Sequence, residues 1–161
     1  MARLNRKTLW IVTAALVAVV VLLQFCPAAR QKMNAYTLKT SSVALTIDQF
    51  DSPERRLFVL ASLTSFPPGR GVWFVFGDTE RARLWSKNLR VEADVLWLDD
   101  THQVVDRDLR VAPCVEANCP EYTPERFASS VLLLPPGTAD DPSLAVGQTA
   151  FLQPVPASPS P

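Results

Sequence analysis

Hydrophobic residues recur along most of this chain in short runs of about four to eight residues, the length expected of β-strands. Val43, Leu45 and Ile47 alternate with small or polar residues, as in a strand with one buried face. The run from Val72 to Phe76 is apolar on both faces, as in a central strand covered from two sides. Further strand patterns occupy residues 83–87, 94–98, 103–110, 129–135 and 147–152.

One helix is predicted among these strands. Asp51 or Ser52 can cap a helix whose first turn contains Pro53 and Glu54, so we expect a short helix from Pro53 to about Leu60. Many short strands with one or two brief helices predict a mainly β domain. A closed or partly open β-barrel protects the strand edges, and two aligned sheets are the alternative.

The longest apolar segment lies near the N-terminus, from Thr8 to Ala29. Its 22 residues carry no charge, and a helix of that length covers the roughly 30 Å hydrocarbon core of a bilayer. A cleaved signal peptide is the alternative, since basic residues precede the apolar stretch. The site for cleavage is poor, because Pro27 separates the only suitably spaced small pair, Cys26 and Ala28. We therefore predict an uncleaved transmembrane anchor over residues 9–29.

The flanking charges predict the orientation of this anchor. Three basic residues and the amino terminus precede the span and two basic residues follow it, so the N-terminus should stay in the cytoplasm. The rest then lies outside a bacterial cytoplasmic membrane, in the periplasm or at the extracellular surface. The expected segments are a cytoplasmic N-terminus at residues 1–8, the anchor at 9–29, a linker at 30–40, a β-rich domain at 41–152, and a disordered proline-rich tail at 153–161.

The formal charge of the chain is balanced but unevenly placed. Residues 1–32 hold five of the 16 basic side chains and no acidic one, so the remaining residues have a net charge of −5. Nucleic-acid binding needs clustered Lys and Arg against phosphates, and we therefore expect no nucleic-acid partner. The sequence has one histidine and no glycine-rich phosphate loop, and so neither a metal nor a cofactor is expected.

Two cysteines lie close together in a proline-containing segment. Cys114 and Cys119 are flanked by Pro113 and Pro120, a rigid loop that can hold the two Cα atoms within the roughly 4.4–6.8 Å that a disulfide requires. Cysteines outside the cytoplasm tend to be oxidised, so we predict a Cys114–Cys119 disulfide. Zinc ligation is a weaker alternative because His102 is the sole histidine. A redox pair is weaker still, because the spacing is not C-x-x-C.

Several short motifs follow one another along the chain: Glu54-Arg55, residues 71–76 (GVWFVF), Trp85 with Lys87 and Asn88, Asp94, and residues 113–122 (PCVEANCPEY). Their order resembles that of the family called domain of unknown function 192, small β-rich bacterial and archaeal domains that often follow a signal or anchor segment. The resemblance covers residues 43–152. It implies a fold and an envelope setting but no activity.

Three motifs of the family are altered in this chain. The G-L-M step reads FVL at residues 58–60, W-M-K-N-T reads WSKNL at residues 85–89, and the final G-D reads Gly147-Gln148. If the family shares a ligand or a reaction at those positions, this chain has changed it.

Lys87, Asn88 and Asp94 form the most chemically suggestive group, a cation, an amide and a carboxylate on strands that are expected to be neighbours. Such a trio can orient a polar ligand, or support hydrolysis beside a fixed cation. A buried polar network that closes the turn at residues 88–91 is the structural alternative. Trp85 beside them offers a flat ring on which a sugar can stack, although a core position is equally open.

These features together predict a membrane-anchored β-domain that acts as a binding or interaction module of the cell envelope rather than as an enzyme. Its expected partners are the membrane, through the N-terminal helix, and an envelope protein. The alternative is a small hydrolase, or a protein that binds a polar ligand such as a carbohydrate, using Lys87, Asn88 and Asp94.

Overall fold

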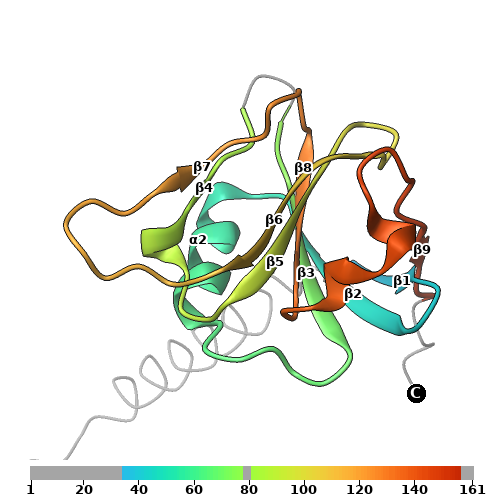
Figure 1. Cartoon of the computed structure of the whole chain (residues 1–161). Coiled ribbons are helices and arrows are strands. Elements are labelled where there is room, and N and C mark those ends of the chain that lie inside the picture. Colours follow the sequence, from blue (N-terminus) through green and yellow to red (C-terminus); the bar gives the residue numbers. More distant parts are fainter. Residues whose placement is uncertain (1–33, 78–80, 157–161) are drawn as a thin grey trace, which may run out of the picture. The chain divides into compact units, whose positions relative to one another are not determined.

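The computed structural model describes residues 34–77 and 81–156, in which one α-helix packs against a twisted β-sheet (Figure 1). The strands are β1 (Ala35–Lys39), β2 (Ala44–Phe50), β3 (Arg70–Val75), β4 (Leu84–Trp85), β5 (Ala93–Leu98), β6 (Val104–Val111), β7 (Glu121–Tyr122), β8 (Ser130–Leu134) and β9 (Leu152–Pro154). The helix is α2 (Pro53–Ser62), and the three short 3-10 turns are η1 (Ser86–Asn88), η2 (Thr138–Asp140) and η3 (Pro142–Leu144).

Seven strands form the main sheet in the order β6-β5-β8-β3-β2-β1-β9. Strands β2 and β3 run parallel and are joined by α2, while the other neighbours in the sheet are antiparallel. The predicted hairpin at residues 94–110 is confirmed as β5 and β6. Strands β4 and β7 pair with each other in a separate two-stranded ribbon.

The three central strands β3, β5 and β8 are buried on both faces. Along each strand, successive side chains enter opposite hydrophobic cores, because side chains alternate across a sheet. One core, under α2 and β4, contains Phe74, Val95, Trp97, Val131 and Leu133. The other core, under η2 and η3, contains Trp73, Leu96, Leu98, Leu132 and Leu134. Trp73 and Trp97 are therefore core residues on opposite faces of the sheet.

Helix α2 begins where the sequence predicted. The hydroxyl of Ser52 accepts a hydrogen bond from the backbone N–H of Arg55 at 3.4 Å, and Pro53 occupies the first turn, where its missing N–H leaves no helical bond unmade. The helix extends to Ser62, two residues beyond the predicted end. Leu60 is buried in the core beneath the helix, whereas Leu57 and Phe58 are largely exposed.

Two segments predicted to lack secondary structure form strands instead. Residues 35–39 of the predicted linker are β1, since Tyr36 and Leu38 alternate with polar neighbours and Leu38 is fully buried. Residues 153–154 of the predicted tail belong to β9, which pairs with β1. Pro154 is tolerated there because β9 lies at the edge of the sheet.

The mainly β class with one short helix is confirmed for the described residues, but the sheet is open and the prediction of a closed barrel was wrong. β6 and β9 are its edge strands. Residues 147–150 approach the start of β6, where the N–H groups of Gly147 and Val104 donate to the carbonyls of Val104 and Gln148, both at 2.8 Å. Residues 147–150 thus contact β6 at one edge of the sheet, and β9, which follows them in the chain, forms the other edge. Among the described residues, β6 and β9 are not paired as neighbouring strands.

The predicted cytoplasmic N-terminus and membrane span at residues 1–29 lie outside the described residues. Within residues 34–77 and 81–156, the only helix of any length, α2, is too short and too polar for a membrane span.

A buried carboxylate holds the turn between β1 and β2 against η3. Asp141, which is 8 % exposed, accepts hydrogen bonds from the hydroxyls of Ser41 and Ser143 at 2.7 Å, and from the hydroxyl of Ser42 at 2.8 Å. The backbone N–H of Ser143 also donates to it, at 2.9 Å. The hydrogen bonds from Ser143, and then those from Ser41 and Ser42, hold the pKa of Asp141 far below its usual range.

Replacing Asp141 by Asn should therefore destabilise the fold in a pH-dependent way. Because the pKa is lowered by folding, the carboxylate stabilises the folded state above its unfolded pKa of about 3.9 and loses that effect as the pH falls below it. We expect D141N to lower the melting temperature at pH 7, with a smaller deficit at pH 3. D100N, at an exposed carboxylate, is the control. Equal deficits of D141N at both pH values would contradict the assignment.

Candidate functional site

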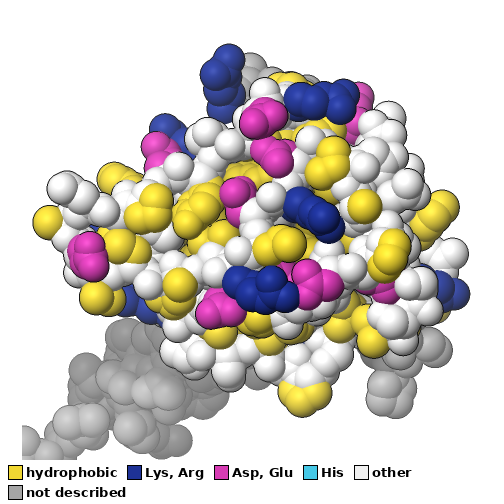
Figure 2. All heavy atoms as spheres, in the orientation of Figure 1, with side chains coloured by type: hydrophobic (Ala, Val, Ile, Leu, Met, Phe, Trp, Pro, Cys, Tyr) yellow, Lys and Arg dark blue, Asp and Glu magenta, His cyan; other side chains and the backbone are white. Residues whose placement is uncertain are grey.

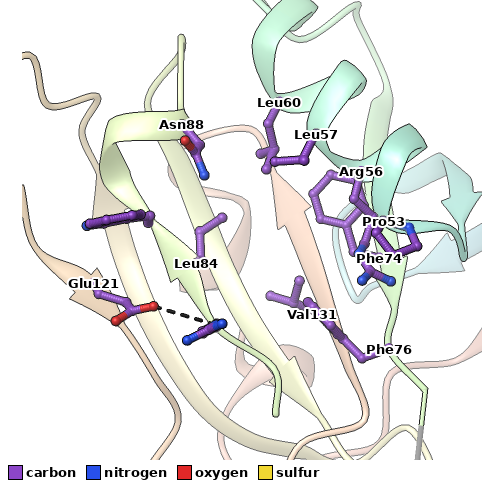
Figure 3. A pocket seen from close by; sticks show the side chains of 12 residues that line it. Pro53, Arg56, Leu57, Leu60, Phe74, Phe76, Leu84, Asn88, Glu121 and Val131 are labelled. Atoms are coloured by element: carbon purple, nitrogen blue, oxygen red, sulfur yellow. Dashed lines mark ion pairs between the residues drawn. The ribbon is translucent and has the colours of Figure 1, made fainter. Parts of the chain in front are cut away.

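A cavity of about 400 Å³ opens between α2 on one side and β4 with η1 on the other (Figure 3). Eight of the twelve residues that line it are apolar: Pro53, Leu57, Leu60, Phe74, Phe76, Leu84, Trp85 and Val131. Four polar side chains complete it: Arg56, Arg83, Asn88 and Glu121. Because α2, β3, β8 and β4 all contribute, the cavity exists only in the folded domain.

The cavity arises from how short β4 is. Sequence analysis predicted a strand over residues 83–87, but the strand stops after Trp85 and the chain turns through η1. Leu84 is buried in the core, while Asn88, at the end of η1, faces the space beside α2 (Figure 3). The gap between the ribbon and the helix is left open because the described residues place no further element there.

Arg56 forms a fixed part of the helical wall. Its side chain is buried, and its Nη1 donates hydrogen bonds to the backbone carbonyls of Val75 at 2.7 Å and Asp51 at 3.3 Å. The guanidinium group lies 4.4 Å from the ring centroid of Phe76, within the range of a cation–π contact. Arg56 therefore ties α2 to the end of β3.

Trp85 forms the rim of the opposite wall and is half exposed. Its indole Nε1 donates a hydrogen bond to the carbonyl of Cys119 at 3.2 Å, which fixes the orientation of the ring. The structure thus places Trp85 at the cavity rather than in a core. Its polar atom is already satisfied, so the ring contributes apolar surface.

Asn88 and the pair Arg83–Glu121 supply the remaining polar groups of the cavity. The carboxamide of Asn88 is partly exposed and makes no side-chain hydrogen bond among the described residues. Arg83 Nε lies 3.7 Å from Glu121 Oε1, an exposed ion pair that is too long for a hydrogen bond. These three side chains therefore retain most of their donor and acceptor capacity.

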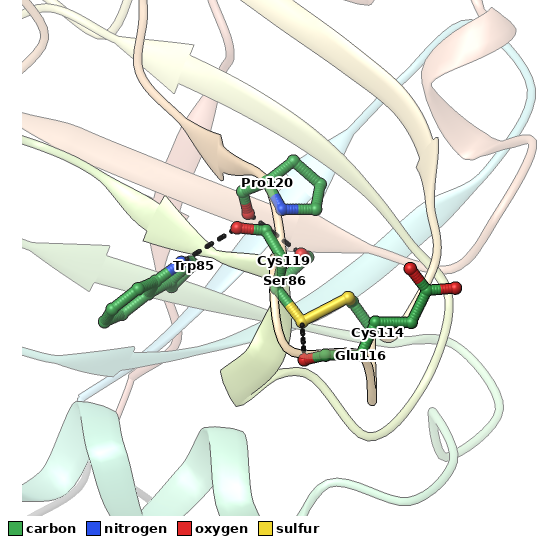
Figure 4. The surroundings of a disulfide bond; sticks show 6 residues. All are labelled: Trp85, Ser86, Cys114, Glu116, Cys119 and Pro120. Atoms are coloured by element: carbon green, nitrogen blue, oxygen red, sulfur yellow. Dashed lines mark hydrogen bonds between the residues drawn. A yellow bond between two sulfur atoms is a disulfide. The ribbon is translucent and has the colours of Figure 1, made fainter.

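The predicted Cys114–Cys119 disulfide is confirmed, with the two Cα atoms 5.6 Å apart (Figure 4). The loop that it closes is bonded directly to the cavity wall. The backbone N–H and hydroxyl of Ser86 donate to the carbonyl of Pro120 at 3.1 and 2.9 Å, and the N–H of Cys114 donates to the carbonyl of Ser86 at 3.3 Å. The disulfide loop thus supports the segment that carries Trp85 and Asn88.

The structure does not assemble the trio of Lys87, Asn88 and Asp94. Asn88 lines the cavity, whereas Lys87 is exposed outside the lining and makes no ion pair or hydrogen bond among the described residues. Asp94 is fully buried, and its two carboxylate oxygens accept the backbone N–H groups of Arg110 and Ala139, both at 2.9 Å. Both oxygens of this carboxylate therefore take part in hydrogen bonds within the fold.

The position of Asp94 follows from the two-residue period of β5. Its neighbour Val95 belongs to the core under α2, on the same face of the sheet as the cavity. Ala139, to which Asp94 is bonded, belongs to the opposite core. Asp94 therefore points away from the cavity, and its hydrogen bonds go to β6 and η2 rather than to the turn at residues 88–91 that the structural alternative expected it to close.

Sequence reasoning missed Arg56, Arg83 and Glu121 as cavity residues. Glu121 lies within the cysteine segment, and its pairing with the strand of Trp85 could not be read from spacing. Arg56 lies in the predicted helix, but its burial depends on the end of β3, 19 residues further on. Alternating polarity around Leu84 was the one available signal for Arg83.

The charged groups on the surface are mixed. On the face shown in Figure 2, basic side chains lie among acidic ones rather than in a single patch. Among the described residues, no group of three His, Cys, Asp or Glu side chains is placed to hold a metal ion.

Because the disulfide loop supports the cavity wall, its removal should affect both stability and the wall. Replacing Cys114 and Cys119 by Ser is expected to cost about 2 kcal/mol, the entropy of closing so short a loop, and to leave the fold intact. The melting temperature measures the first effect, and the tryptophan fluorescence emission, compared with that of a Trp85→Phe background, measures the second. Two reactive thiols in protein isolated without reductant, or an unchanged melting temperature, would contradict this account.

Structural comparisons show what the fold resembles. A protein from Sinorhizobium meliloti 1021, described as a candidate transcription regulator, matches with a TM-score of 0.57 and 23 % identity, over 75 % of this chain and 92 % of that one. A protein of unknown function from Novosphingobium aromaticivorans matches with a TM-score of 0.56 and 15 % identity, over 75 % of this chain and 83 % of its own. At these identities the likeness shows the fold alone.

Sequence comparisons agree with the motifs. No curated protein sequence matches the chain. Residues 36–151 match the family model described as "Uncharacterized ACR", domain of unknown function 192. The motifs that carried the resemblance include α2, β3 and the Trp85 segment, which surround the cavity. The chain therefore belongs to the domain of unknown function 192 family.

Proposed function

We propose that this chain is a binding module of the cell envelope whose cavity takes the apolar part of a small ligand. The observation that carries the proposal is the carboxamide of Asn88, which lies without a protein hydrogen-bond partner among the described residues, in a cavity lined mainly by apolar side chains. Small-molecule sites typically combine apolar walls with a few polar groups that fix orientation, in volumes of roughly 300–1,000 Å³.

The rigidity of the walls supports this proposal. Arg56 anchors the helical wall to β3, and the disulfide loop holds the wall of Trp85 and Asn88. A cavity held in this way is formed before the ligand arrives, so binding loses less conformational entropy than binding to a mobile loop.

The alternative of a hydrolase or polar-ligand site built on Lys87, Asn88 and Asp94 has less support. The oxygens of Asp94 already accept two backbone N–H groups, on the far side of the sheet from the cavity. A general base must reach the proton that it removes. Of the three side chains only Asn88 lines the cavity, and an amide is neither acid nor base at neutral pH.

The setting of the module is the second part of the proposal. The uncharged segment at residues 8–29, with more basic residues before it than after it, favours an anchor in the cytoplasmic membrane and an exported domain. The Cys114–Cys119 disulfide suits such an oxidising compartment. An envelope protein remains a proposed partner.

We do not propose a role in transcription for this chain, although one structural neighbour is described as a candidate transcription regulator. The two chains share 23 % identity, and residues 33–161 of this chain have a net charge of −5, opposite to the charge that attracts nucleic acid. We propose no nucleic-acid partner.

The cavity can be tested with a neutral aromatic probe, 3-phenylpropan-1-ol, by calorimetric titration of the full chain in lipid nanodiscs against empty nanodiscs. L57W should fill the cavity and weaken binding about tenfold or more, since it displaces the apolar body of the probe. F58W places the same side chain at the next, exposed and non-lining position of α2 and should bind normally. The proposal fails if the parent binds no probe, or if both variants bind it equally.

The anchor can be tested in intact spheroplasts. Added protease should digest the β-domain, because it lies outside the membrane, while a protease-resistant fragment containing residues 9–29 stays with the membrane. Mass measurement of the untreated protein should find the N-terminal residues still attached. A mature chain that starts at Ala29, or a domain that resists protease until the membrane is broken, would refute the anchor or its orientation.

A further inference from the structure

The polar groups around the cavity divide into those that the fold uses and those that it leaves available. The indole N–H of Trp85 is bonded to Cys119, and Arg56 is bonded to Val75. Arg83 and Glu121, in contrast, have only each other among the described residues, across 3.7 Å. A guanidinium group and a carboxylate therefore lie side by side at the mouth of an apolar cavity, and neither forms a hydrogen bond.

Strand pairing holds these two charges in place. Glu121 on β7 pairs with Trp85 on β4, so these two side chains lie on one face of the ribbon. Arg83 lies just before β4 and is exposed like Trp85, while Leu84 between them is buried, which places Arg83 on the same face. In Figure 3, Glu121 lies on the wall opposite α2, and the dashed line marks its ion pair with Arg83. The order of the charges, positive on the β4 side and negative on the β7 side, is therefore fixed by register.

This arrangement complements a ligand that carries both charges. In an α-amino acid the ammonium nitrogen and the carboxyl carbon are about 2.5 Å apart, from the N–Cα and Cα–C bond lengths. Such a zwitterion can lie beside the ion pair with its carboxylate against Arg83 and its ammonium against Glu121. Its side chain is then directed toward the apolar lining, which includes Leu57 and Leu84.

A ligand with a single charge suits this mouth less well. A carboxylate that approaches Arg83 also approaches Glu121, and an ammonium that approaches Glu121 also approaches Arg83. Like charges placed side by side are unfavourable, so the ion pair selects against both kinds of ligand while it attracts the zwitterion.

We propose that the cavity binds a small zwitterion with an apolar side chain, of the α-amino acid class, through Arg83 and Glu121. The inference rests on the proposed function, because the apolar part of this ligand occupies the same cavity. It adds that the ligand carries both a positive and a negative charge, and that Glu121 and Arg83 bind them.

The test compares four ligands that share one phenylalkyl body. Phenylalanine carries both charges, 3-phenylpropionate lacks the ammonium, phenethylamine lacks the carboxylate, and 3-phenylpropan-1-ol is neutral. Calorimetric titration of the full chain in nanodiscs should give the lowest Kd for phenylalanine, by about tenfold over each of the other three, because charge-assisted contacts are the stronger ones.

Two variants should separate the two contacts. R83Q should weaken phenylalanine about tenfold and leave phenethylamine unweakened, while E121Q should weaken phenylalanine about tenfold and leave 3-phenylpropionate unweakened. The matched controls R81Q and E116Q remove the same charges at exposed positions outside the cavity lining and should change none of these values. Melting temperatures of all four variants should stay near that of the parent, because exposed ion pairs contribute little to stability.

The outcomes distinguish this inference from the proposed function. If the neutral alcohol binds and L57W weakens it, but phenylalanine binds no better than its singly charged relatives, the cavity stands and the zwitterion is refuted. If R83Q and E121Q weaken phenylalanine no more than R81Q and E116Q do, the assigned residues are wrong. If none of the four ligands binds, the proposed function itself fails. Tighter binding of an amidated phenylalanine than of the free amino acid would point to a peptide N-terminus and overturn the proposal.

Discussion

The structure depends on covering both faces of three apolar strands. Strands β3, β5 and β8 supply side chains to two cores at once. Each face of the sheet must therefore be covered by other elements of the chain. Helix α2 covers one face, and η2, η3 and the following segment cover the other. The packing leaves no spare room at Gly71, where a Cβ atom would come within 2.8 Å of the side chains of both Ile47 and Leu134. Helix α2 does not cover the whole of its face, and the cavity lies between it and the short strand β4.

The cavity is bounded by two supports of different chemistry. On the helical side, the guanidinium of Arg56 bridges the carbonyls of Asp51 and Val75, so backbone atoms far apart in sequence are held by one side chain. On the ribbon side, a covalent link closes the loop that bonds to Trp85 and Ser86. A ribbon of two short strands is barely stable alone, which explains why the cross-link stands here and not in the main sheet.

The central strands could be predicted from the sequence because each is a short, nearly continuous apolar run, such as residues 72–76 in β3 and residues 130–134 in β8. The cap of α2 and the disulfide could also be predicted, because each joins residues that are close together in the sequence. The cavity was less predictable, because it joins segments that are far apart in the sequence and become neighbours only through the topology of the fold. Asp94 and Asn88 are six positions apart, yet Asn88 ends the 3-10 turn η1 beside the cavity, whereas Asp94 lies in β5 with its side chain on the opposite face of the sheet. β1 was missed because a five-residue strand beside a polar segment offers too few alternations to stand out.

Where the chain enters and leaves this domain has a mechanical consequence. The backbone N–H of Val155 donates to the carbonyl of Ala35 at 2.9 Å, so the start of β1 and the end of the edge strand β9 lie side by side. Joining these two ends by a short connection and opening the chain at a surface turn would preserve the sheet order, as in a circular permutant. Tension applied between the two ends would break β1 from β9 one hydrogen bond at a time, long before it reached the central strands. Under tension the edge strand would therefore separate first, while the central strands stay paired.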